Sequence, residues 1–171
     1  MSRTSITMTT MTCTLAIASI LTMAAGSRHA TSPSGAVASL HCEIPCGIFD
    51  DHAEVQQMLL DAKTIAKASA QIKLLNEEPS AEHFNTMTRW VMVKEEHSRK
   101  IQHTIAWYFM AQRVKPVASS EPGYRLYLEK LVKHQAIMIN AMKAAQSLDE
   151  SAQQRLTSSI EAIAPWYPAE G

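Results

Sequence analysis

From residue 51 onward, apolar side chains recur every three or four positions, which is the spacing of an amphipathic helix rather than of a strand. The first stretch of this kind follows Asp50 and predicts one helix. Asp51, with Glu54 three residues later, has the pattern of a capping box at the start of that helix. The positions expected to face inward are Val55, Met58, Leu59, Ala62, Ile65, Ala66, Ser69 and Ile72.

Three more helical segments follow along the chain. A polar run over residues 76–80 separates the first helix from a longer one that reaches about Arg113, and a loop over 114–123 precedes a third. Residues 152–163 predict a short fourth helix, which Pro165 ends. The inward positions predicted for the second helix are Phe84, Met87, Val91, Lys94, Ser98, Ile101, Ile105 and Tyr108. Those predicted for the third are Tyr124, Tyr127, Leu128, Leu131, Met138, Ala141, Met142 and Ala145. Short connections favour an all-α fold, an antiparallel four-helix bundle over about 51–165.

Composition excludes several classes of protein. The 171 residues carry 16 basic and 16 acidic side chains, whereas a nucleic-acid-binding protein normally has a clustered basic excess. Three cysteines are too few for a disulfide-dense scaffold. Five glycines and 6% aromatic residues fit poorly with a β-sandwich. The function therefore has to come from a local site.

The first forty residues differ in character from the rest. Their only charges are Arg3 and Arg28, on either side of an apolar stretch over residues 13–25. That stretch has the length of a secretory h-region and is shorter than the ~20 residues of a stable membrane span. We expect residues 1–40 to be a signal-like leader that is removed; a marginal membrane anchor or a buried core helix is the alternative. The remaining domain, 41–171, has a net charge of −2.

Residues 41–50 read His-Cys-Glu-Ile-Pro-Cys-Gly-Ile-Phe-Asp, and we call this segment the hook. Pro45 and Gly47 favour a loop in which Cys42 and Cys46 bring both sulfurs to one point. Thiolates are soft ligands that select copper(I), zinc, nickel or iron–sulfur chemistry over magnesium or calcium, and the His41 imidazole adds a further donor. The alternative is a structural Cys42–Cys46 disulfide in an exported helical-bundle interaction protein without catalysis. A metal-trafficking protein is a third possibility.

The hook resembles the mature amino terminus of the nickel-containing superoxide dismutases, which reads His-Cys-x-x-Pro-Cys-Gly-x-Tyr-Asp. Six of the seven defined positions match. Residues 88–97 and 112–116 also resemble segments of that family, so that the similarity spans 41 to about 148. It implies an oxidoreductase that converts superoxide to dioxygen and hydrogen peroxide by Ni(II)/Ni(III) cycling.

The resemblance also implies the ligand set. One nickel ion per subunit is held in a square plane by the thiolates of Cys42 and Cys46, the α-amine of His41 and the deprotonated amide nitrogen of Cys42. The His41 imidazole is an axial ligand in the oxidised state. Since the α-amine exists only after cleavage between Leu40 and His41, a leader-cleaving protease is an expected partner. The family further implies a homo-oligomer, a hexamer of four-helix bundles.

Other residues of the hook are expected to surround the nickel ligands. The family usually has tyrosine where this chain has Phe49, whose ring can form a wall but cannot donate a proton. Glu43 stands where aspartate is common and keeps the charge, and the Ile44–Pro45 bond is cis if it follows the family. The residues expected to orient the ligands are Glu43, Pro45, Gly47, Phe49, Asp50 and, from the second helix, His97.

The remaining histidines give weaker signals. His97 and His103 are six residues apart and do not share one helix face, which argues against a joint metal site. We expect a solvated His52, and His83 and His134 have no clustered partners in the sequence. The leader predicts an exported protein, periplasmic or extracellular. A cytoplasmic protein is the alternative, because a reducing compartment protects the thiols until nickel arrives.

Overall fold

The computed structural model describes residues 49–169, and every regular element in this range is a helix. The elements are α1 (Asp51–Leu75), α2 (Ala81–His103), η1 (Thr104–Arg113), α3 (Tyr124–Gln146), α4 (Glu150–Glu161) and η2 (Ala164–Trp166). The all-α prediction is confirmed for these residues. The leader, 1–40, and hook residues 41–48 lie outside the described residues.

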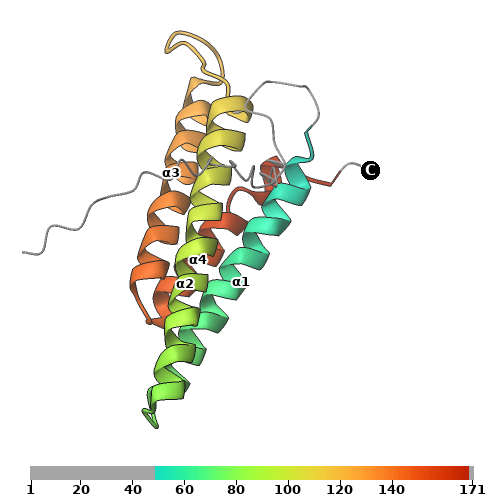
Figure 1. The fold of residues 1–171 in the computed structure, drawn as a ribbon. Coiled ribbons are helices and arrows are strands. Elements are labelled where there is room, and N and C mark those ends of the chain that lie inside the picture. The colour runs from blue at the N-terminus through green and yellow to red at the C-terminus, as the bar shows by residue number, and fades with distance from the viewer. Residues whose placement is uncertain (1–48, 170–171) are drawn as a thin grey trace, which may run out of the picture. The chain divides into compact units, whose positions relative to one another are not determined.

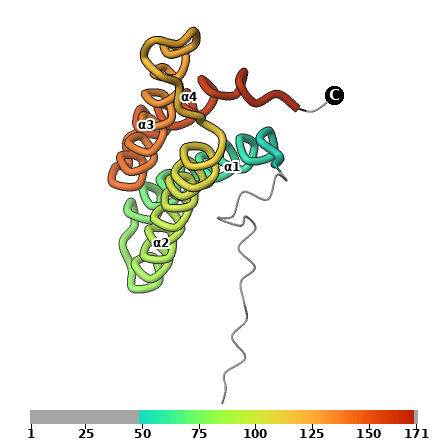
Figure 2. The backbone as a smooth tube through the Cα atoms, turned by 90° about the horizontal axis from the view of Figure 1, so that it is seen from above, coloured from blue at the N-terminus to red at the C-terminus, as the bar shows by residue number. Residues whose placement is uncertain are grey.

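The four α-helices form an antiparallel bundle (Figure 1). Helix α1 packs against α2 and α4, and α3 packs against the same two helices from the other side. Figure 2, which looks down on the bundle, shows the α1–α2 pair beside the α3–α4 pair. None of the described helices is long and apolar enough to cross a membrane.

Helix α1 begins one residue earlier than the capping-box pattern predicts. Its cap is Asp50, whose carboxylate accepts a hydrogen bond from the backbone N–H of Ala53 at 2.8 Å. Asp51 does not cap the helix, because its carboxylate is held by side chains from the end of η1. The prediction that Asp51 caps α1 is therefore wrong, and a long-range ion pair is the reason.

The inward face of α1 is the predicted one, whereas parts of α2 and α3 differ. On α2, the predicted positions Phe84 and Val91 are exposed, whereas the predicted positions Lys94, Ser98 and Ile101 are buried. On α3, Leu128 and Met142 are exposed. The buried positions of α3 are His134, Ile137, Ala141 and Ala144. The amphipathic spacing thus predicts the helices correctly, but it extends the buried face of α2 too far toward its start and misplaces the face of α3 by about one position.

A buried polar cluster lies where α3 turns into α4, and we call it the foot of the bundle: Ser69, Lys94, Ser147 and Gln153. The Lys94 ammonium donates to the carbonyl of Ser147 at 2.7 Å. The Gln153 amide nitrogen donates to the Ser69 hydroxyl and to the Ser147 carbonyl, both at 3.1 Å. Burial lowers the pKa of Lys94. These bonds join α1, α2 and α4 to the last residues of α3.

Candidate functional site

The structure describes three of the residues that the sequence assigns to the site: Phe49, Asp50 and His97. The proposed nickel ligands His41, Cys42 and Cys46 precede the described residues, as do Glu43, Pro45 and Gly47. The site can therefore be built from its base, where the hook joins α1.

Phe49 is partly buried between two side chains of η1. Its ring meets the edge of the Tyr108 ring with centroids 5.7 Å apart. The guanidinium carbon of Arg113 lies 4.4 Å from the centre of the Phe49 ring, within the range of a cation–π contact. The Phe49 ring is thus held between Tyr108 and Arg113.

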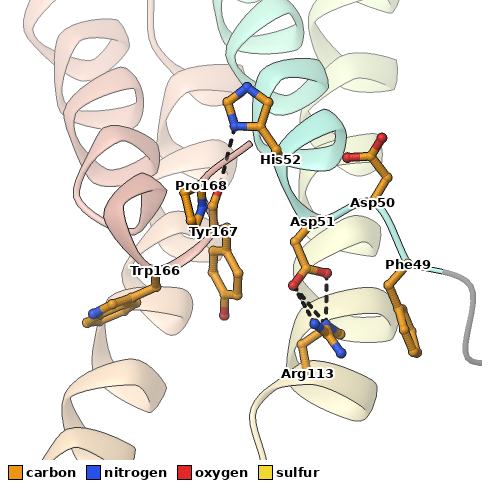
Figure 3. A pocket seen from close by; sticks show the side chains of 8 residues that line it. All are labelled: Phe49, Asp50, Asp51, His52, Arg113, Trp166, Tyr167 and Pro168. Atoms are coloured by element: carbon orange, nitrogen blue, oxygen red, sulfur yellow. Dashed lines mark hydrogen bonds and ion pairs between the residues drawn. The ribbon is translucent and has the colours of Figure 1, made fainter. Parts of the chain in front are cut away.

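Asp51 is the centre of a charged cluster that connects α1 to η1. The Arg113 guanidinium donates through Nη2 to one Asp51 oxygen at 2.6 Å and through Nε to the other at 2.8 Å. The Tyr108 hydroxyl donates to Asp51 Oδ1 at 2.7 Å. A forked Arg–carboxylate pair fixes orientation as well as distance. Figure 3 shows this pair between Asp51 and Arg113, with Phe49 at one side.

The π-helical turn of η1 explains why Tyr108 and Arg113 reach the same carboxylate. The two residues are five apart, which in an α-helix of 3.6 residues per turn separates them by roughly 140° around the axis. In a π-helix each N–H bonds to the carbonyl five residues earlier, so residues five apart lie one above the other. The Val114 N–H, which donates to the Phe109 carbonyl at 2.8 Å, continues this pattern.

The cluster changes the acidity of its members. The pKa of Tyr108 is raised, first by burial and then by the hydrogen bond to Asp51. The hydrogen bond that Arg113 makes to Asp51 raises the pKa of Arg113 as well. Both groups therefore keep their protons throughout the neutral range, and Tyr108 donates to the carboxylate without titrating.

A cavity of about 300 Å³ opens beside this cluster, at the start of α1 (Figure 3). Its wall is formed by Phe49, Asp50, Asp51, His52, Arg113, Trp166, Tyr167 and Pro168. His52 is partly buried, and its Nδ1 lies 3.4 Å from the carbonyl oxygen of Tyr167. The expectation of a solvated His52 therefore holds only in part, because the carboxy-terminal segment packs over this side chain.

Behind the cavity, Tyr167 is held by a histidine for which the sequence indicates no partner. His134 is fully buried; its Nδ1 lies 2.7 Å from the Lys130 carbonyl and its Nε2 lies 3.1 Å from the Tyr167 hydroxyl. The ring therefore donates through Nδ1 and accepts from Tyr167. Burial lowers the pKa of His134 and raises the pKa of Tyr167 to about 12.

His97 lies elsewhere in the bundle. Its Nδ1 is 2.6 Å from the carboxylate of Asp61 on α1. Asp61 is ten residues beyond Asp51, which corresponds to about 15 Å along the helix axis. His103 does not join it, and its ring lies tilted against that of Trp107, with centroids 6.0 Å apart. Among residues 49–169, no three His, Cys, Asp or Glu side chains are placed to share a metal ion.

The sequence does not reveal Asp51, Tyr108 and Arg113 as a unit. Its periodicity places Arg113 only at the end of a helix, and Tyr108 only on an inward face. Their contacts with α1 span 57 and 62 residues of sequence, so no local spacing indicates them. The available signal is the isolated basic residue at the end of the second helix, opposite the acidic start of the first in an antiparallel bundle.

Comparison with known families shows the family of the chain. Residues 36–170 match the family model described as nickel-containing superoxide dismutase. No curated protein and no solved structure matches the chain. The family match covers both the hook residues and the whole described bundle. The chain therefore belongs to the family of nickel-containing superoxide dismutases, oxidoreductases that act on superoxide.

Proposed function

We propose that the chain, once cut to begin at His41, dismutates superoxide by Ni(II)/Ni(III) cycling at one nickel ion per subunit. The observation that carries this proposal is the family match over residues 36–170, which includes the complete hook. The proposed ligands are the thiolates of Cys42 and Cys46, the α-amine and imidazole of His41, and the deprotonated amide of Cys42.

The donor set suits nickel in this role. When bound, nickel supplies one-electron chemistry, through which one superoxide loses an electron to give dioxygen and another gains one, with two protons, to give hydrogen peroxide. Thiolates and an anionic amide are strong electron donors, which favour the higher oxidation state. Thiolates are also oxidised by peroxide, and for this reason the site needs restricted access.

The chain's own residues have separate tasks. Removal of the leader frees the α-amine of His41, because a nitrogen that is part of a peptide bond cannot act as an amine donor. Backbone N–H groups of residues 43–47 orient the superoxide anion, and Glu43 keeps the charge of the aspartate that is common at its position in the family. Phe49 excludes water from one side without donating a proton. Protons therefore come from water or from a backbone amide.

The subunit is proposed to work as part of a homo-oligomer, a hexamer by resemblance to the family. Large apolar side chains that are exposed in the single chain support a subunit contact: Phe84 is 69% exposed, Met92 66% and Val132 64%.

A protease that cuts before His41 is a necessary partner. The leader directs export to the periplasm or the exterior, and a cytoplasmic location is the alternative.

The experiment starts from protein cut to begin at His41. It is reduced, given nickel and freed of unbound metal, after which nickel per chain and superoxide decay are measured. We expect one nickel per chain and catalysed decay, and we expect Cys42→Ser and Cys46→Ser each to lose both. His103→Gln is the matched control, because it removes a histidine outside the hook.

One outcome contradicts the proposal directly. A chain that is isolated with a complete Cys42–Cys46 disulfide and takes up no nickel after reduction is not a nickel enzyme. That result supports the alternative of an exported interaction protein.

A further inference from the structure

Arg113 contacts the short segment that joins the hook to the bundle at two places. Its guanidinium packs 4.4 Å from the centre of the Phe49 ring, and it makes a forked pair with Asp51. The intervening residue, Asp50, is held by its cap bond to Ala53. Three successive residues are therefore fixed, and Arg113 holds two of them.

The distance from this segment to the proposed ligands is short. Cys46 precedes Phe49 by three residues, which span at most about 11 Å of extended chain. The position of Phe49 therefore limits how far Cys46 can lie from the bundle. Metal sites depend on such outer contacts to hold their ligands in the required geometry.

The form of the Arg113 contacts favours positioning over stability. The Arg113 and Asp51 side chains are 33% and 16% exposed, and ion pairs with this access to water contribute little to folding. A planar guanidinium can stack on a ring while its edge binds a carboxylate, whereas a lysine ammonium cannot do both. Arg113 uses both properties at once, on residues that lie on either side of Asp50.

We propose that Arg113 is a positioning residue for the nickel site, which holds Phe49 and Asp51 so that the hook leaves the bundle in one fixed direction. The inference rests on the proposed function. It assigns to Arg113 no contact with superoxide or with nickel. Its role depends on the shape of the guanidinium rather than on its charge.

The test compares Arg113→Lys, which keeps the charge but loses the fork, with Arg113→Met and with the unsubstituted chain, all cut to begin at His41. The control is Lys143→Met, which removes one exposed positive charge near the other end of the bundle. Two properties are measured on nickel-loaded protein: the rate at which a chelator removes the metal, and the electron paramagnetic resonance spectrum of the oxidised site.

We expect both Arg113 variants to bind one nickel per chain, to release it about 10- to 100-fold faster, and to give broadened spectra. Lys143→Met should match the unsubstituted chain. A wild-type release rate and spectrum in Arg113→Lys overturn the inference. By contrast, failure of the unsubstituted chain to bind nickel overturns the proposed function itself.

A second variant covers the case in which the Arg113 variants do not fold. Asp51→Asn retains Arg113 and the Tyr108 hydrogen bond but removes the carboxylate charge that orients the fork. Faster nickel release in Asp51→Asn supports the positioning role, and an unchanged rate contradicts it.

Discussion

The head and the foot of the bundle use polar side chains in different ways. The head comprises the residues around the cavity, Phe49 to His52, Arg113 and the carboxy-terminal Trp166 to Pro168, together with Tyr108. There, a partly exposed ion pair holds the first residues of α1 beside the cavity. At the foot, buried Lys94 and Gln153 bind backbone carbonyls at the end of α3.

This difference separates a stabilising cluster from a positioning one. If a buried donor at the α3–α4 turn is lost, the carbonyls that it bonds are left poorly paired. The foot therefore contributes to the free energy of unfolding. The partly exposed pair at the head contributes less free energy but fixes a direction of the chain. Substitutions at the foot should therefore change stability, and substitutions at the head should change the nickel site.

The largest expected effect is at the foot. Gln153→Ala removes the donor that serves Ser69, the Ala144 carbonyl and the Ser147 carbonyl, so the free energy of unfolding should fall by about 2 kcal/mol. Urea unfolding of the cut chain measures this loss. The exposed neighbour Gln154, whose side chain bonds only within its own helix, provides the control Gln154→Ala. Accelerated nickel release in Gln153→Ala would break the distinction between the two ends.

The second effect is a pH dependence behind the head. Because the pKa of buried His134 is lowered below its ordinary value of 6.5, the unfolded chain binds a proton there at a pH where the folded chain does not. Stability should therefore fall as the pH drops below 6.5, with a contribution from this group of up to about 1.4 kcal/mol per pH unit.

Unfolding of nickel-free protein between about pH 6.5 and 5 tests this dependence. His134→Leu should have the shallower slope, while Tyr167→Phe, which keeps the imidazole, should retain the wild-type slope. Identical slopes in His134→Leu and the unsubstituted chain mean that His134 protonates in the folded state as readily as in the unfolded state.

The smallest effect is expected at Phe49. Its ring is already placed by Tyr108 and Arg113 without a hydroxyl. Phe49→Tyr should therefore alter the rate of superoxide loss by less than about tenfold. A required general acid, by comparison, contributes about a hundredfold or more. Rates across a pH series are the measurement. A rate gain of about a hundredfold in Phe49→Tyr would show that proton supply limits the reaction in this chain and that the head is catalytic.

Local pattern predicts the helices because each must bury a stripe of apolar side chains. It places the inward face of α1 correctly, from Val55 to Ile72, and it places the break at Pro79. It fails at Phe84 and Val91, since the neighbours that cover a helix face are not encoded in its own spacing. It also does not predict the π-helical form of η1.

The candidate site likewise has one part that the local sequence predicts and one part that it does not. The hook is local in sequence, so a short motif carries the family resemblance that predicts nickel and its ligands. The contacts of Arg113 with Phe49 and Asp51 depend on the antiparallel packing of α1 against η1, across more than sixty residues. No short motif contains them.

The central claim is that the nickel site forms only when His41 is the first residue. The most direct measurement compares cut chains that begin at His41 and at Leu40, loaded with nickel in parallel and assayed for superoxide decay. Both have the same thiols and the same bundle, but the second has an amide in place of the α-amine. We expect catalysed decay from the chain that begins at His41 and none above background from the chain that begins at Leu40. Equal rates from the two chains would contradict it.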